Sequence, residues 1–299
     1  MDTDTPVGPK SKKIVVGIDD SQRARSAALW AADEADRHQL PLLVVLGADL
    51  DRLTRFASFE TVERIRSSGR SLLLETLSAV QQRYPGLTVT EELSFKEPVS
   101  ALHTTAGPHD TIVIGSRGRG GFRSLKLGSV SLGVAAGSAV PVIVVRDETE
   151  RPETGLVTAA VHGPTDAAWL ARAAREAQVR KASLRLLSVQ KHLSHVGPED
   201  TTPDDVDAVA RRRDDVEAAL VSGLRAEFPR LDITADVEAG RSAAAVLVEA
   251  SLHTDLLVVG ARRSDNMRSG LGRVAHTLLH HSHCPVEVVP RRKGVDQEG

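Results

Sequence analysis

The chain has 299 residues, 41% of them hydrophobic and 26% charged, which is the composition of an ordinary globular protein. At roughly 150 residues per domain, this length predicts two domains, each large enough for its own core. Lysine and arginine number 38 against 40 aspartates and glutamates, and only 3% of the residues are aromatic. The composition therefore argues against nucleic-acid binding, which needs a positive surface and often stacking aromatics.

The sequence also predicts a cytoplasmic protein without a membrane partner. No apolar run approaches the roughly 18 residues of a membrane span. The first residues, MDTDTPVGPKSKK, lack the apolar stretch of a signal peptide. The single cysteine, Cys284, excludes an internal disulfide, and this fits a reducing compartment.

An internal repeat organises the chain, because four landmarks recur in the same order 144 or 145 residues apart. The pairs are Tyr84-Pro85 with Phe228-Pro229, Thr111 to Gly115 with Leu256 to Gly260, Leu127-Gly128 with Leu271-Gly272, and Pro141 to Val145 with Pro285 to Val289. We therefore predict two copies of one domain, at residues 13–146 and 155–290. The linker is predicted at 147–154, with tails at 1–12 and 291–299.

In the first copy, short apolar runs alternate with segments of helical periodicity. The predicted strands are Ile14 to Ile18, Leu42 to Leu46, Leu87 to Leu93, Thr111 to Gly115 and Val142 to Val145. The predicted helices run from a cap at Ser21 through Ala35, from Val62 through Val80, from Val99 through Thr105, and onward from Gly128. The second copy repeats this order.

The predicted fold class is α/β, with two tandem doubly wound domains. Each contains a five-stranded parallel sheet of order 3-2-1-4-5 with helices on both faces. In this order strands one and four are neighbours, and the crevice at their carboxyl ends is where such folds bind ligands. The residues that follow Ile18 and Ile114 are therefore the candidate ligand contacts.

After strand four the first copy is rich in glycine, with five glycines in residues 115–128. Glycine lets an anion approach the backbone amides closely. The helix start at Gly128-Ser129 offers amides without internal partners, which attract phosphate. Positive charge is added by Arg117, Arg119, Arg123 and Lys126. The alternative interpretation is a flexible turn whose charges face water.

Asp19 follows strand one on the opposite side of this crevice. A carboxylate suits a neutral hydroxyl or amine better than a phosphate, so base or ribose is expected at Asp19 and phosphates at the glycine-rich loop. Asp19 is alternatively an ordinary carboxylate at a helix start. Asp20 and Ser21 are predicted to be turn and capping residues.

Two widespread phosphate motifs do not fit: no P-loop follows the first strand, and Arg123 replaces the third glycine of the dinucleotide fingerprint. The pattern Gly-x2-Gly-x9-Gly-Ser does fit, at Gly115, Gly118, Gly128 and Ser129. Together with Val16-Gly17-Ile18-Asp19-Asp20-Ser21, this pattern resembles that of the universal stress proteins in their tandem two-domain form. The resemblance covers nearly the whole chain.

The resemblance implies an ATP-binding protein of the stress response that regulates through its nucleotide, with magnesium accompanying the ATP. It places the adenosine near Gly17, Ile18, Asp19 and Val45, and the phosphates near Gly115, Arg117, Gly118, Gly128, Ser129 and Val130. It also implies that the last strands of the two domains pair at a dimer-like interface within one chain, with a homodimer as an alternative.

The second copy departs from this motif. In the sequence alignment, Ala159 to Gly163 stand where the first copy has Gly17 to Ser21, and Val161 replaces the carboxylate of Asp19. Arg263 replaces the second glycine, and Arg273 replaces the serine. We expect a degenerate structural copy, although the two arginines leave anion or ATP binding there as an alternative.

Other functions stay open at this point. One is a nucleotide-free scaffold with an unknown protein partner, and a less favoured one is an enzyme that adenylates or slowly hydrolyses ATP. No catalytic residue is predicted, because no general base is evident near the phosphates. His280-His281-Ser282-His283-Cys284 resembles a metal cluster, but consecutive residues cannot easily point at one ion, so no metal site is predicted. Cys284, Trp30 and Trp169 are predicted to be packing residues.

Overall fold

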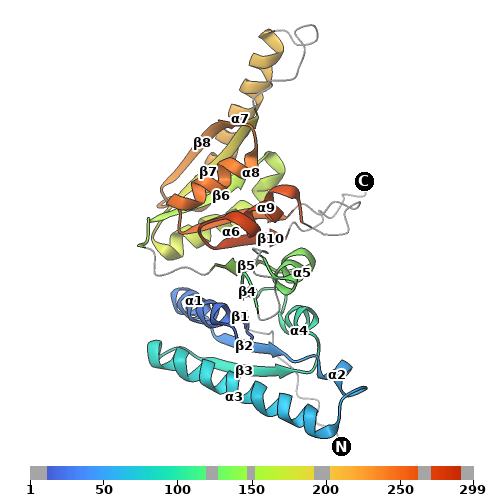
Figure 1. The fold of residues 1–299 in the computed structure, drawn as a ribbon. Helices are drawn as coiled ribbons and strands as arrows, with labels where there is room; N and C mark the ends of the chain where they lie inside the picture. Colours follow the sequence, from blue (N-terminus) through green and yellow to red (C-terminus); the bar gives the residue numbers. More distant parts are fainter. Residues whose placement is uncertain (1–11, 119–126, 147–151, 192–202, 262–270, 291–299) are drawn as a thin grey trace, which may run out of the picture. The chain divides into compact units, whose positions relative to one another are not determined.

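The computed structural model describes residues 12–118, 127–146, 152–191, 203–261 and 271–290, with the side chains of 203–213 left out. The chain divides into two compact units, Met1–Asp147 and Glu148–Gly299. Figure 1 shows both units and labels most of their helices and strands. Within the described residues, no helix is long and apolar enough to cross a membrane.

The N-terminal unit contains a five-stranded parallel sheet. Its strands are β1 (Ile14–Gly17), β2 (Leu42–Gly47), β3 (Val89–Ser94), β4 (Thr111–Gly115) and β5 (Val142–Val145). The order within the unit is β3-β2-β1-β4-β5, and each neighbouring pair is parallel. The predicted order 3-2-1-4-5 is therefore confirmed.

Helices cover both faces of this sheet. They are α1 (Gln22–His38), α2 (Leu50–Leu53), α3 (Phe59–Arg83), α4 (Pro98–Thr105) and α5 (Ser129–Gly137). α1 contacts α3, and α4 contacts α5, so the helices form one pair on each face, as Figure 1 shows. Ser21 caps α1 as predicted, because its hydroxyl accepts from the backbone N–H of Ala24 at 3.2 Å.

Element boundaries differ from the prediction by a few residues. The third strand begins at Val89 instead of Leu87, because the backbone N–H of Leu87 closes a turn onto the carbonyl of Tyr84 at 3.1 Å. The first strand ends at Gly17, one residue before Ile18. The first helix continues past Ala35 to His38. The four-residue helix α2 was not predicted, since so short a segment carries no periodicity.

The C-terminal unit repeats this architecture. Its parallel strands are β6 (Leu156–Val161), β7 (Ser183–Lys191), β8 (Ile233–Gly240), β9 (Leu256–Ala261) and β10 (Val286–Pro290), in the order β8-β7-β6-β9-β10. Its helices are α6 (Ala167–Arg180), α7 (Pro203–Glu227), α8 (Ala243–Ala250) and α9 (Arg273–His281), with short 3-10 turns η1 (Pro164–Asp166) and η2 (Ser251–His253). The pairing of the last strands of the two copies stays a prediction.

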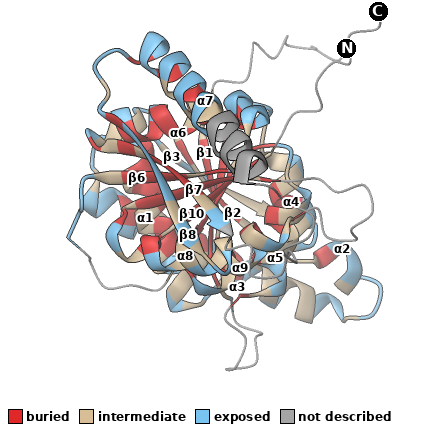
Figure 2. Cartoon of the chain, turned by 90° about the horizontal axis from the view of Figure 1, so that it is seen from above, coloured by how far each residue is buried: buried red, intermediate tan, exposed pale blue. Residues whose placement is uncertain are grey.

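The core of each unit lies between its sheet and its helices. Every residue of β4 is buried, whereas the edge strand β3 exposes Thr90 and Glu91. Figure 2 shows the buried residues concentrated in the strands and on the helix faces that pack against them. Cys284 is buried at 3% exposure and Trp169 likewise, which confirms both as packing residues.

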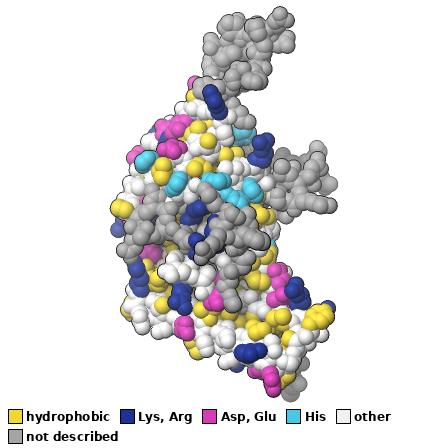
Figure 3. All heavy atoms as spheres, viewed as in Figure 1, with side chains coloured by type: hydrophobic (Ala, Val, Ile, Leu, Met, Phe, Trp, Pro, Cys, Tyr) yellow, Lys and Arg dark blue, Asp and Glu magenta, His cyan; other side chains and the backbone are white. Residues whose placement is uncertain are grey.

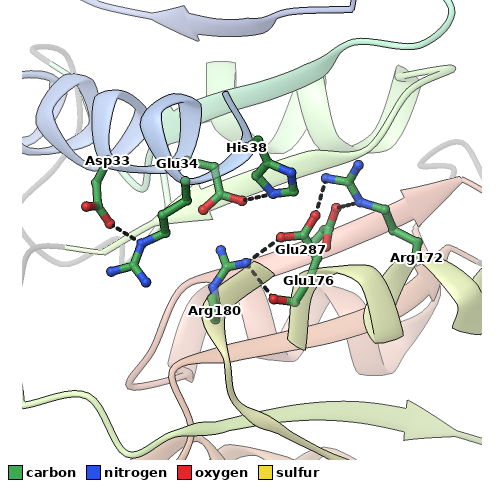
Figure 4. A network of polar contacts seen from close by, with 8 residues as sticks. Asp33, Glu34, His38, Arg172, Glu176, Arg180 and Glu287 are labelled. Atoms are coloured by element: carbon green, nitrogen blue, oxygen red, sulfur yellow. Dashed lines mark hydrogen bonds and ion pairs between the residues drawn. The ribbon is translucent and has the colours of Figure 1, made fainter. Parts of the chain in front are cut away.

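The first helix of each unit also carries a buried glutamate (Figure 4). In α1, Glu34 Oε1 lies 3.1 Å from His38 Nε2. In α6, Glu176 lies 2.7 Å from the guanidinium of Arg172, which also contacts Glu287 of β10 at 2.9 Å. The three glutamates are at most 1% exposed. Each has a basic partner within its own unit, as a buried carboxylate requires.

Candidate functional site

A cavity of about 350 Å³ lies at the carboxyl ends of β1 and β4 in the N-terminal unit. All ten contacts predicted from the sequence line it, namely Gly17, Ile18, Asp19, Val45, Gly115, Arg117, Gly118, Gly128, Ser129 and Val130. The fold therefore brings together residues from β1, β2, β4 and the start of α5. Their role in holding a ligand stays a prediction.

One wall of the cavity is apolar and comes from the end of β2 and the start of α4. Val45 and Leu46 meet Pro98 and Leu102 there. Gly47 lines the same wall, and a Cβ added to it would lie 2.6 Å from the Cα of Pro98. Among the residues of this wall, only Val45 was predicted from the sequence. Two features of the sequence could have indicated the rest, namely a glycine at the end of a strand and a proline at the first position of a helix.

Gly17 has a packing role as well as a place in the cavity. A Cβ at this position would lie 2.7 Å from a methyl group of Leu102 on α4. Glycine therefore lets α4 approach the end of β1 closely. The shape of the apolar wall depends on this approach.

Asp19 lines the cavity and also lies just before the start of α1. Its role as a ligand contact stays a prediction. Its Oδ1 accepts hydrogen bonds from the backbone N–H of Ser21 at 3.1 Å and from the Ser21 hydroxyl at 2.5 Å. A Cβ added to Gly118 would lie only 2.1 Å from Asp19 Oδ2. The carboxylate thus packs directly against the backbone of the loop after β4, where glycine alone leaves room.

The start of α5 is tied to the end of β4 by two hydrogen bonds. The Gly128 N–H donates to the carbonyl of Ser116 at 2.8 Å, and the Ser131 hydroxyl donates to the carbonyl of Gly115 at 2.8 Å. The first amides of a helix have no acceptor within the helix and carry partial positive charge. Because Ser129 and Val130 line the cavity, this helix start can attract an anion there.

The charged groups of the site are only partly described. Arg117 lines the cavity, and its Cα would lie 3.5 Å from a Cβ added to Gly128 at the start of α5. Arg119, Arg123 and Lys126, which the sequence also offered, lie outside the described residues.

Glu97 supports the cavity from outside by capping α4. Its carboxylate accepts from the backbone N–H of Ser100 at 2.8 Å, from the Ser100 hydroxyl at 2.6 Å and from the N–H of Val99 at 3.2 Å. The hydrogen bond from the Ser100 side chain is the main reason that the pKa of Glu97 lies below its ordinary value. The ionised carboxylate therefore fixes the first turn of the helix that carries Pro98 and Leu102.

The counterpart of Asp19 in the C-terminal unit is His162, and the sequence alignment with Val161 was wrong by one residue. In the sheets, Ile14 lies opposite Thr111 and Val157 lies opposite Leu256. Since Leu256 repeats Thr111, Val157 repeats Ile14, and five positions further on His162 repeats Asp19. The expectation that the carboxylate is missing is unaffected.

The C-terminal unit uses a different carboxylate at this place. Asp166 is 1% exposed, and its Oδ2 accepts from the N–H of His162 at 2.6 Å and of Gly163 at 3.1 Å. Its Oδ1 accepts from the indole N–H of Trp169 at 3.1 Å. The indole lies against the end of β9, because a Cβ on Gly260 would be 2.5 Å from Trp169 Nε1. Asp166 therefore ties the turn after β6 to Trp169, which packs against the end of β9.

Two remaining positions of the degenerate motif are only partly described. Arg273 is the first residue of α9 and is exposed. Arg263 lies outside the described residues.

Two tandem doubly wound domains, one with a cavity at its topological switch point, define a class of α/β proteins, and in such folds the switch point is the usual place for a ligand. The sequence profile of the universal stress protein family matches residues 10–146 and 156–290. The chain belongs to the universal stress protein family, in its tandem form.

Relatives of the same tandem length support this assignment. The chain is 26% identical to universal stress protein Rv2005c of Mycobacterium tuberculosis over 289 residues, which are 93% of this chain and 97% of that protein. It is 27% identical to Rv2624c of the same organism over 286 residues, 95% of this chain and 98% of that protein. A universal stress protein of Mycolicibacterium smegmatis is 36% identical over 134 residues, 44% of this chain and 45% of that protein.

Solved structures show the same fold. The crystal structure of a universal stress protein from Archaeoglobus fulgidus has a TM-score of 0.66 at 17% identity, and the match covers 93% of this chain and 96% of that one.

Proposed function

We propose that the N-terminal unit binds ATP and that the protein regulates a stress response through this nucleotide. The observation that supports the proposal is the convergence of ten predicted contacts on one cavity at the switch point. Its volume of about 350 Å³ lies in the range of small-molecule sites. The second copy is proposed to be structural, because it has His162 in place of Asp19 and Arg273 in place of Ser129.

The proposed orientation follows from the chemistry of the walls. The adenine would pack between Val45 and Leu102, and the ribose would lie beside Asp19. A carboxylate accepts several hydrogen bonds, so Asp19 can keep Ser21 as a donor and accept from a ribose hydroxyl as well.

The phosphates would lie at the loop after β4 and at the start of α5. Gly118 lets them approach the backbone, and Arg117 and the first amides of α5 favour negative charge. A magnesium ion bound with the nucleotide would neutralise phosphate charge. We assign no protein group to this ion and propose that it enters the site already bound to ATP.

Calorimetric titration with ATP and magnesium tests the proposal. The expected stoichiometry is one nucleotide per chain, because the ligand set is intact only in the N-terminal unit. Two equivalent sites would contradict the structural role of the second copy, and no binding would overturn the proposal. The nucleotide released by denaturing the purified protein gives an independent check.

The proposed role is regulation instead of rapid catalysis. No nucleophile with an adjacent base is recognised among the residues that line the cavity. We therefore expect ATP turnover far below about 1 per second, the lower end of the usual enzyme range. A steady rate above that value from highly purified protein, lost in Asp19→Ala, would favour the alternative enzyme hypothesis.

A further inference from the structure

Helix α9 of the C-terminal unit carries two imidazoles one turn apart. His276 and His280 are four residues apart, a spacing that places both side chains on one face of a helix. Their ring centroids are 4.6 Å apart and their planes are inclined by 34°. His276 is exposed and His280 is half-buried. Figure 3 shows histidine side chains gathered on this face of the unit.

The fold itself does not require these histidines. α5 and α9 are equivalent helices, because each begins after a glycine N-cap and both bury residues at the same three positions. The buried residues are Ser131, Val134 and Ala135 in α5, and Ala275, Leu278 and Leu279 in α9. At the positions of His276 and His280, α5 has Leu132 and Ala136. The imidazoles therefore lie off the buried stripe, and the same helix forms without them.

We propose that His276 and His280 form a two-imidazole chelate for a divalent transition-metal ion, with water in the remaining coordination positions. Two imidazole nitrogens bound to one metal at about 2.0–2.1 Å place their ring centroids roughly 5 Å apart. The observed separation of 4.6 Å is close to this value. The two imidazoles are therefore close enough to share one ion.

The chemistry of the ligands selects the ion. Neutral imidazole is a common ligand for copper, nickel and zinc, whereas magnesium and calcium prefer oxygen ligands. A site without an imposed geometry follows the general order of divalent affinity, in which Cu²⁺ binds more tightly than Ni²⁺ or Zn²⁺.

The histidine run noticed in the sequence is not itself this site. His280 and His281 are adjacent, and their ring centroids are 6.1 Å apart. Cys284 is buried at 3% exposure, so its thiol does not reach an ion at the helix surface. The partner of His280 lies upstream of the run, one helical turn away at His276. This is why the argument against consecutive ligands does not apply to the pair.

Copper titration of the full chain tests the chelate. Calorimetry measures the number of Cu²⁺ ions bound and their affinities, and paramagnetic resonance at one equivalent reports the nitrogens bound to the metal. The variants are His276→Leu and His280→Ala, which introduce the residues that α5 has at these positions. Circular dichroism of each variant verifies that the helix is retained.

Each single variant should lower the affinity of this site at least about tenfold, because the second metal–nitrogen bond is intramolecular in the pair and lost in the variant. The double variant should bind one Cu²⁺ fewer per chain. The control variants are His281→Ala and His109→Ala, and His109 is an exposed histidine of the N-terminal unit. Each should change the affinity less than about twofold, because neither residue belongs to the chelating pair. Unchanged copper stoichiometry in the double variant, or a loss as large in His281→Ala, would overturn the proposal.

Discussion

The two copies share a strand order but differ at the carboxyl ends of their central strands. In the N-terminal unit, a Cβ added to Gly115 would lie 3.1 Å from the backbone of Arg23 in α1. Gly115 also lines the cavity. In the C-terminal unit, the corresponding glycine, Gly260, packs against the indole of Trp169. The same backbone position thus lines a cavity in one copy and packs against an indole in the other.

The difference can be traced to one position on the first helix. α1 and α6 end at Gln39 and Lys181, which both adopt a left-handed conformation, so their residues correspond at a spacing of 142. Trp169 then corresponds to Ala27. The first copy therefore has a methyl group where the second has an indole that reaches Gly260. A duplicated domain can change its core in this way without changing its topology.

Trp169→Ala should have the largest effect and tests the packing side of this comparison. Truncating a buried aromatic residue destabilises a protein by roughly 3–5 kcal/mol, so chemical denaturation should show a loss of this size for the C-terminal unit. Trp30→Ala, which changes a half-buried residue, should cost less. The ATP stoichiometry should stay at one, because His162 still stands in place of Asp19. A second ATP site in Trp169→Ala would show that the indole alone prevents binding.

Gly118→Val should weaken ATP binding most. Its Cβ would lie 2.1 Å from Asp19 Oδ2, so the side chain displaces the carboxylate and obstructs the approach of phosphates to the loop. The loss of two hydrogen bonds to a charged ligand, each worth about 1.5–3 kcal/mol, predicts a decrease of more than about 100-fold. Calorimetry measures it, with circular dichroism as the check on folding.

Arg263→Val is the matched control for Gly118→Val, because Arg263 occupies the corresponding motif position in the second copy. ATP affinity should stay within about twofold of the wild type, because this variant loses no hydrogen bond to the nucleotide. Equal weakening in the two variants would refute the division into a binding copy and a structural copy.

Asp19→Ala should have an intermediate effect on ATP affinity. The lost hydrogen bond to the nucleoside costs roughly 1–3 kcal/mol, which corresponds to about 5- to 150-fold in affinity. Asp19→Asn keeps an acceptor for the Ser21 donors and should lose less. His162→Ala, at the corresponding position of the second copy, should not change the affinity. If all three variants bound ATP like the wild type, the nucleoside would not lie at Asp19.

The sequence predicted the strands well because their signals are local. β4 is a continuous apolar run that ends in glycine, and its predicted and observed bounds are identical, Thr111–Gly115. The alignment of His162 failed because β6 repeats β1 at a spacing of 143 residues whereas α6 repeats α1 at 142, and only the pairing of β6 with β9 reveals this. The contact of Trp169 with Gly260 joins residues 91 positions apart in the sequence, and no local pattern indicates it.

The smallest expected effect concerns the capping of α4 and of its counterpart α8. Glu97 caps α4 through three hydrogen bonds, whereas Ser242, 145 residues later, makes no side-chain capping bond in α8 among the described residues. Replacing a capping side chain by alanine costs about 0.5–2 kcal/mol, and the exposed position of Glu97 favours the lower end of this range. Ser242→Ala should cost less.

The pH dependence separates this cap from simple packing. Because the pKa of Glu97 is lower in the folded protein than in the unfolded chain, the stabilisation is fully present above the unfolded pKa and is lost as the pH falls through the folded pKa. The difference in unfolding free energy between wild type and Glu97→Ala should therefore shrink from pH 7 toward pH 3, while that for Ser242→Ala stays constant. Urea denaturation across this range measures both differences. A difference for Glu97→Ala that did not change with pH would mean that the ionised carboxylate is not what fixes the start of α4.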